Sequence, residues 1–160
     1  QNYGKGEYER IRRGTLQTFV IMLVIYAVCL AAGLLLSIGG AYQYIFMSAD
    51  KVTPETIRFG NTYIYVDMIL YFILGALFVT RSASQGICRS GYVLAAGFAE
   101  LVARVLICAF LPAVVNGGAV DSTASLAAFA AVCFGDPGAW VAAVIILSIP
   151  TVRCIIKMKY

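Results

Sequence analysis

The chain has 160 residues, of which 61% are hydrophobic and 12% are charged, with a net charge of +4 and no histidine. Soluble domains usually carry about 45–50% apolar and about 25% charged residues, so this composition, with a mean hydropathy of +0.87, excludes a soluble globular domain. The absence of histidine excludes histidine-ligated zinc, bis-histidine haem and histidine general-base catalysis.

The first long apolar run covers residues 15–39 and contains no charged residue. A bilayer-spanning helix needs about 20 mostly apolar residues, so this run predicts a membrane span that follows a lead-in over residues 1–14. The next segment, residues 41–61, is mixed in character. Thr53 followed by Pro54 is typical of a helix N-cap and first helical position, and we expect a short surface helix there.

Three further apolar runs predict membrane spans over residues 63–86, 91–115 and 126–155. The last run is interrupted at residues 135–138, where Asp136 before Pro137 is typical of an N-cap from which the helix restarts. Small residues are dense in the third and fourth spans, which predicts that these two helices pack closely. The sequence therefore predicts an all-α, polytopic membrane protein with four transmembrane helices.

Basic residues gather in the N-terminal stretch, in the turn after the second span and in the C-terminal tail. They are Lys5, Arg10, Arg12, Arg13, Arg81, Arg89, Arg153, Lys157 and Lys159. The other two loops hold Lys51 and Arg58 in one and no basic residue in the other. Cationic loops are retained in the cytoplasm, so we expect a multi-pass protein of the cytoplasmic membrane with both termini in the cytoplasm.

The third span contains two charges, Glu100 and Arg104, which lie four residues apart. This spacing places them on one helix face, with the acid in the more favourable N-terminal position. An unpaired charge at the centre of a bilayer costs roughly 2.5–3.5 kcal/mol on insertion scales. We therefore expect an intramembrane ion pair between them, either a structural pair that fixes helix packing or a gating or proton-relay pair.

One acid, Asp67, lies in the second span with Tyr63 and Tyr71 one helical turn on either side, and Phe78 follows at helical spacing. A carboxylate supplies charge and an aromatic face supplies cation–π contact, which is the chemistry of organic-cation binding. These four residues are the candidate substrate-binding site. The alternative is a solvated acid at the water interface. Arg81 is expected to extend its charge to the cytoplasmic interface.

The remaining residue types predict no metal site and no cofactor. The five cysteines have no C-x-x-C spacing and are expected to be small buried hydrophobes. No glycine-rich loop follows a strand, and the basic residues flank apolar runs, which favours lipid over nucleic acid as a partner. No paired catalytic carboxylates or activated nucleophile stand out, so we do not expect an enzyme.

Four motifs resemble those of multidrug and toxic compound extrusion (MATE) transporters. Residues 1–14 (QNYGKGEYERIRRG) resemble the family's QNYGAGK-x-ER-I-x-x-G stretch between the eighth and ninth helices. Residues 84–90 (SQGICRS) resemble its LQGxGxS turn after the tenth helix. Residues 99–105 (AELVARV) are similar to its eleventh-helix E-L-x-x-R pattern, and residues 136–140 (DPGAW) to the x-P-x-A-W start of its twelfth helix. The motifs occur in the family's order and cover nearly the whole chain.

The resemblance implies that residues 15–160 form the last four helices of a twelve-helix transporter, and that an N-terminal lobe completes it. Such transporters export organic cations or drugs by rocker-switch alternating access, in exchange for protons or sodium. Sodium-coupled members carry an acid deep in the tenth helix, at the depth of Leu74 here, whereas Asp67 lies about two turns nearer the outer end. The alternatives are a lipid-linked oligosaccharide flippase of the same superfamily and a small four-helix membrane scaffold protein.

Overall fold

A computed structural model of the chain describes residues 1–121 and 124–157, and it forms helices and turns without any strand in that part of the chain. The basic tail residue Lys159 lies outside the described residues. The elements in chain order are α1 (Tyr8–Ser37), η1 (Ile38–Gly40), α2 (Gln43–Phe46), η2 (Ala49–Lys51), α3 (Pro54–Gly86), α4 (Ser90–Asn116), α5 (Leu126–Cys133) and α6 (Gly135–Lys157). This confirms the all-α fold class.

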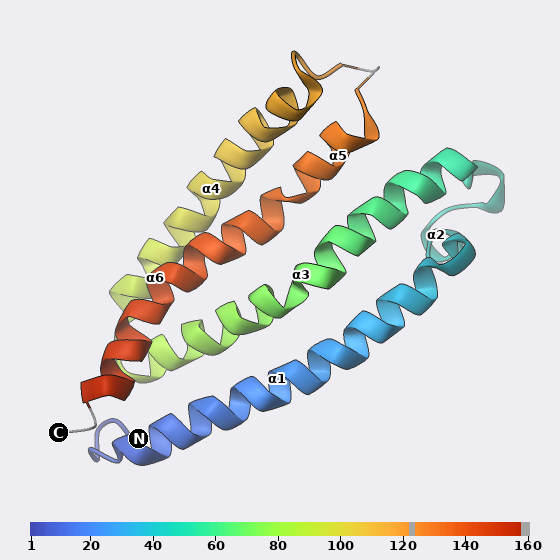
Figure 1. The fold of residues 1–160 in the computed structure, drawn as a ribbon. Coiled ribbons are helices and arrows are strands. Elements are labelled where there is room, and N and C mark those ends of the chain that lie inside the picture. Colours follow the sequence, from blue (N-terminus) through green and yellow to red (C-terminus); the bar gives the residue numbers. More distant parts are fainter. Residues whose placement is uncertain (122–123, 158–160) are drawn as a thin grey trace.

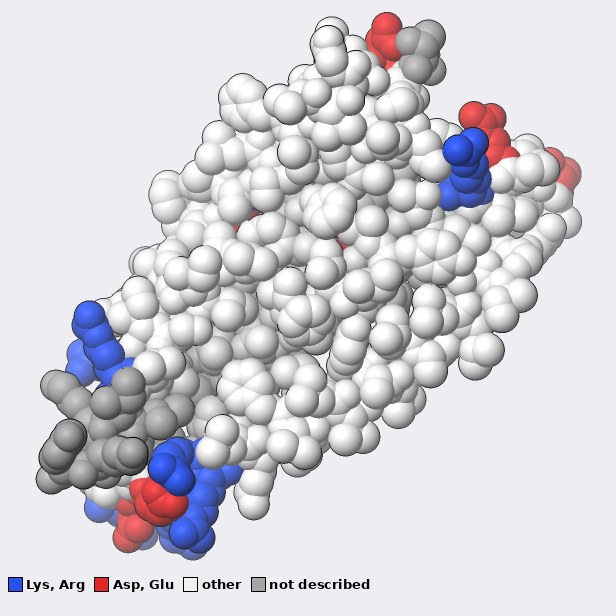
Figure 2. Space-filling view, viewed as in Figure 1, with Lys and Arg blue, Asp and Glu red and all other residues white. Residues whose placement is uncertain are grey.

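Four helical segments are long and apolar enough to cross a membrane: Tyr8–Gly40, Pro54–Gly86, Ser90–Asn116 and Leu126–Cys154. They confirm the four expected spans and define a multi-pass membrane protein. In Figure 2 the Lys, Arg, Asp and Glu side chains gather at the two ends of the visible face, and a wide uncharged zone with only small acidic areas separates them. An uncharged belt of this kind matches the hydrocarbon layer of a bilayer.

Two helices begin earlier than the sequence predicts. The helix α1 begins at Tyr8, so half of the expected lead-in is helical, and Glu9 stabilises its first turns by pairing with Arg13 at 2.9 Å. The helix α3 begins at Pro54, with the Thr53 hydroxyl accepting the Thr56 N–H at 3.1 Å as expected for an N-cap. The prediction of a short surface helix separate from the second span was therefore wrong, because α3 continues without a break through that span.

The fourth span bends at Phe134, where α5 ends and α6 begins. The cap that starts this span is Ser125, whose hydroxyl accepts the Ala128 N–H at 3.2 Å. Asp136 lies in the first turn of α6 rather than at its N-cap. The prediction that it caps this helix was therefore wrong. Its carboxylate is free to interact with another helix instead.

The helix α6 lies beside both α3 and α4 and packs on each of them (Figure 1). The buried core at this junction consists of Leu77, Ala96, Trp140, Ala143 and Leu147. Because Ala96 and Ala143 are fully buried, the backbones of α4 and α6 can approach closely. This confirms the expected packing of the third span on the fourth.

The helix α1 packs on α3, and its most apolar stretch has no buried residue. In Figure 1 the start of α1, the turn between α3 and α4 and the end of α6 lie at one end of the molecule, and α2 and the start of α5 lie at the other. The expected arrangement, in which the basic segments share one end, therefore agrees with the fold.

Candidate functional site

Two ion pairs join the membrane-spanning helices to one another. The Arg81 Nη2 of α3 lies 2.6 Å from the Glu100 Oε1 of α4, and these side chains are only 27% and 20% exposed. The Arg104 Nη2 of α4 lies 2.7 Å from the Asp136 Oδ1 of α6, with exposures of 46% and 39%. Together they connect α4 to both of its neighbouring helices.

The expected pairing of Glu100 with Arg104 was therefore wrong, although both residues do form ion pairs. The two share a face of α4, but each has an opposite charge on a neighbouring helix at hydrogen-bond distance. A pair between helices also fixes their packing, which a pair within one helix does not. Arg81 is likewise partly buried and paired.

Asp67 lies close to the middle of α3 and is 7% exposed. Its Oδ1 is buried and has no hydrogen-bond partner. This burial does not agree with the alternative of a solvated interfacial acid. Buried polar atoms are nearly always hydrogen-bonded, and a carboxylate inside a membrane is costly, so an unpartnered Asp67 oxygen marks a candidate binding position.

Aromatic residues lie on both sides of Asp67, as the sequence predicted. The Tyr63 phenol is close enough to interact electrostatically with the Asp67 carboxylate. Tyr71 packs edge-on against Trp140 of α6, with ring centroids 6.0 Å apart and an interplanar angle of 87°. The carboxylate and the two phenols therefore occupy consecutive turns of α3 on the side that faces α5 and α6.

A cavity of about 310 Å³ opens beside this stretch, between α3, α4 and the α5–α6 bend. The residues that line it are Tyr63, Arg104, Cys108, Phe129, Val132, Cys133, Gly135 and Asp136. Asp67 is close enough to Asp136 and Cys133 to interact electrostatically with both. Among the residues that line the cavity, Asp136 and Arg104 form an ion pair. Asp67 lies near Asp136 without lining the cavity, and it adds a carboxylate that no arginine or lysine pairs with in the described part of the chain.

Phe78, the fourth predicted site residue, lies elsewhere. It lines a different cavity, together with Val79 and residues of α1. Although the helical spacing from Asp67 is regular, eleven residues separate the two along the axis, which is roughly 16 Å in a helix. The structure therefore brings together Asp67, Tyr63 and Tyr71 and excludes Phe78.

Sequence reasoning missed Asp136 and interpreted it only as a helix cap. A signal was available, because an acid inside an apolar segment is expected to have a partner or a function. The cysteines also differ from expectation. Only Cys133 is buried, Cys154 is half-buried, and Cys29, Cys88 and Cys108 are exposed.

Comparisons of the chain with protein-family models, with curated proteins and with solved structures found no match. The class that the fold defines is a multi-pass, all-α membrane protein. Its site combines a buried carboxylate, two phenols and an interhelical ion pair beside a cavity.

Proposed function

We propose that the chain is the C-terminal four-helix part of a MATE-type secondary transporter. In this proposal it exports organic cations or drugs by alternating access, coupled to protons or sodium. The observation that carries the proposal is Asp67, a buried carboxylate with an unpartnered oxygen near the middle of a membrane-spanning helix. The order of the four sequence motifs supports the family.

The chemistry around Asp67 fits an organic cation better than the alternative cargo. Such a ligand gains from a desolvated carboxylate and from aromatic faces, and Tyr63 and Tyr71 supply these on the neighbouring turns. A lipid-linked oligosaccharide carries a phosphate-linked lipid, for which a cavity with excess basic charge is expected. A scaffold protein has no use for a buried acid with an unpartnered oxygen inside the membrane, because such an acid only costs free energy there.

The proposed partners are the bilayer and an N-terminal lobe of the same transporter. Exposed apolar side chains along α1, including Val20, Val24, Val28 and Leu35, suit contact with lipid tails. In this arrangement α3, α4 and α6 provide the C-lobe wall of the transport cavity.

Asp67→Asn tests the proposed cargo site. In cells that express the full-length transporter carrying this segment, we expect this change to weaken efflux of cationic dyes far more than Asp50→Asn. Asp50 is an exposed acid of η2, and water and salt screen its charge. Asp67→Glu should retain part of the activity because it keeps the charge. Efflux is measured at matched expression, and an Asn variant that pumps cationic dye like wild type would contradict the proposal.

The orientation of the chain is a second expectation. We propose that residues 1–14, the turn at Arg89 and the tail at Lys157 face the cytoplasm, because they carry most of the basic charge. In a variant without the natural cysteines, an impermeant thiol reagent added outside the cell should label a cysteine near Asp50 or Asp121. It should not label a cysteine near Arg89. External labelling at that position would contradict the proposed orientation.

A further inference from the structure

A second cavity, separate from the Asp67 site, lies where the N-terminal segment, the α3–α4 turn and α6 meet. It has a volume of about 430 Å³ and is lined by Tyr3, Tyr8, Ile87, Arg89, Tyr92, Pro150, Arg153 and Cys154. Its two guanidinium groups come from segments that are 64 residues apart in sequence. Among the described residues, no acidic side chain lines it, so the cavity is basic.

Neither Arg89 nor Arg153 is in an ion pair within the described part of the chain, where the pairs involve Arg12, Arg13, Arg81 and Arg104. Two unpaired guanidiniums around one cavity repel each other, and an anion between them removes that cost. Arginine also binds phosphate through two parallel hydrogen bonds. Tyr3, Tyr8 and Tyr92 add phenol donors at the same cavity.

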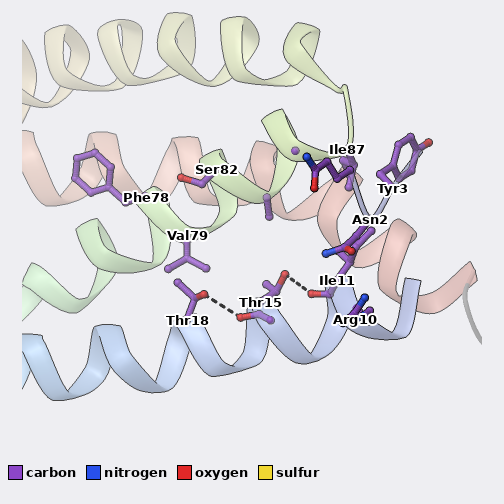
Figure 3. Close-up of a pocket in the computed structure, with 14 residues that line it drawn as sticks. Asn2, Tyr3, Arg10, Ile11, Thr15, Thr18, Phe78, Val79, Ser82 and Ile87 are labelled. Atoms are coloured by element: carbon purple, nitrogen blue, oxygen red, sulfur yellow. Dashed lines mark hydrogen bonds between the residues drawn. The ribbon is translucent and has the colours of Figure 1, made fainter. Parts of the chain in front are cut away.

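An apolar groove of about 470 Å³ adjoins the basic cavity and shares Tyr3 and Ile87 with it. Figure 3 shows this groove between α1 and α3, with Ile11, Phe78 and Val79 along it. The Thr15 and Thr18 hydroxyls donate to the Ile11 and Gly14 carbonyls at 2.9 and 2.8 Å. Because these donors are already used within α1, the wall of the groove offers mainly apolar surface.

We propose that this pair of cavities binds one anionic phospholipid, with its phosphate between Arg89 and Arg153 and an acyl chain in the groove between α1 and α3. The basic cavity lies at one end of the four spans, where the headgroups of one leaflet are found, and the groove extends from it along α1 and α3 as far as Thr18 and Phe78. Basic pockets between transmembrane helices bind anionic headgroups. A soluble phosphate would use only the basic cavity, whereas a phospholipid fills both. The site is independent of the transport function proposed above.

The test uses the protein that contains these 160 residues, purified in detergent and equilibrated with equal amounts of dioleoyl phosphatidylglycerol and dioleoyl phosphatidylcholine. Native mass spectrometry then measures which lipid stays bound. We expect phosphatidylglycerol to be retained preferentially. Arg89→Gln with Arg153→Gln should reduce that preference by roughly fivefold for each arginine removed. Lys5→Gln with Arg13→Gln is the matched control, because it removes the same charge at the same end from residues that line neither cavity.

Two further variants test whether the loss of lipid comes from the binding site rather than from misfolding. A competition experiment distinguishes a lipid from free phosphate. Arg89→Lys with Arg153→Lys keeps the charge but loses the bidentate hydrogen bonds, so it should keep more of the preference than the glutamine variant and less than wild type. Ala83→Trp fills the groove and should lower retention of phosphatidylglycerol. Excess glycerol phosphate should not displace the lipid. Equal retention of the two lipids by the wild-type chain, an unchanged preference in the glutamine variant, or displacement of phosphatidylglycerol by glycerol phosphate would each overturn the proposal.

Discussion

Glu100→Gln is expected to lower the folded yield of the protein in membranes, and a second change, Arg81→Leu, is expected to restore much of it. The Arg81 guanidinium lies 2.6 Å from the Glu100 carboxylate, and both side chains are largely shielded. Removing one partner of a fully buried pair costs about 3–5 kcal/mol because the other charge is left uncompensated. For this partly exposed pair we expect about 2 kcal/mol.

The arginine whose replacement rescues Glu100→Gln shows whether Glu100 pairs with Arg81 or with Arg104. If Glu100 paired with Arg104, as spacing along α4 suggests, Arg104→Leu would rescue Glu100→Gln. In the structure Arg104 forms an ion pair with Asp136. Arg104→Leu should therefore destabilise the protein further, because it leaves the Asp136 carboxylate without its partner. The measurement is the fraction of monodisperse protein after detergent extraction, with the free energy of unfolding from denaturant titration of each double-mutant cycle. Rescue by Arg104→Leu alone would refute the interhelical pair.

Gly135→Ala is expected to destabilise the protein by about 1–3 kcal/mol, the usual cost of overpacking. Gly135 is the first residue of α6, and a Cβ atom there would overlap the Cys108 Sγ of α4. Relief of the overlap requires either a change of the Cys108 χ1 rotamer or a shift of α4 away from α6. The expected result is a lower thermal midpoint and a wider separation of α4 from the α5–α6 bend.

Cys108→Ala should rescue Gly135→Ala, because it removes the overlapping sulfur. Gly97→Ala is the matched control within α4, since nothing lies within 4 Å of a Cβ atom at that position. It should be neutral or stabilising, because alanine is the better helix former by roughly 0.5–1 kcal/mol. Thermal unfolding followed by circular dichroism compares the three variants. An equal loss in Gly97→Ala and Gly135→Ala would show that the close approach of α4 to α6 is not the cause.

The candidate site was only partly predictable. Asp67 with Tyr63 and Tyr71 follows from helical spacing, because residues one turn apart share a face whatever the helix packs against. The choice between a solvated and a buried acid does not follow from that spacing, since burial of Asp67 depends on the helices that pack against α3. The prediction that Phe78 belongs to the same site was wrong, because one helix can border two different cavities along its length. Only the neighbouring helices decide where each cavity lies.

By itself the sequence determined that this is a membrane protein, how many times it crosses, and which segments share an end. These properties depend on the length of apolar runs and on the placement of charge, which are local to each segment. Only the tertiary structure decided which charges meet. Glu100 could have paired within α4 or across to α3, and the free energies of such pairs differ little until the neighbouring helices fix the distances. Packing of α6 on α3 and α4 settles this, placing Asp136 beside Arg104 and leaving Arg81 for Glu100.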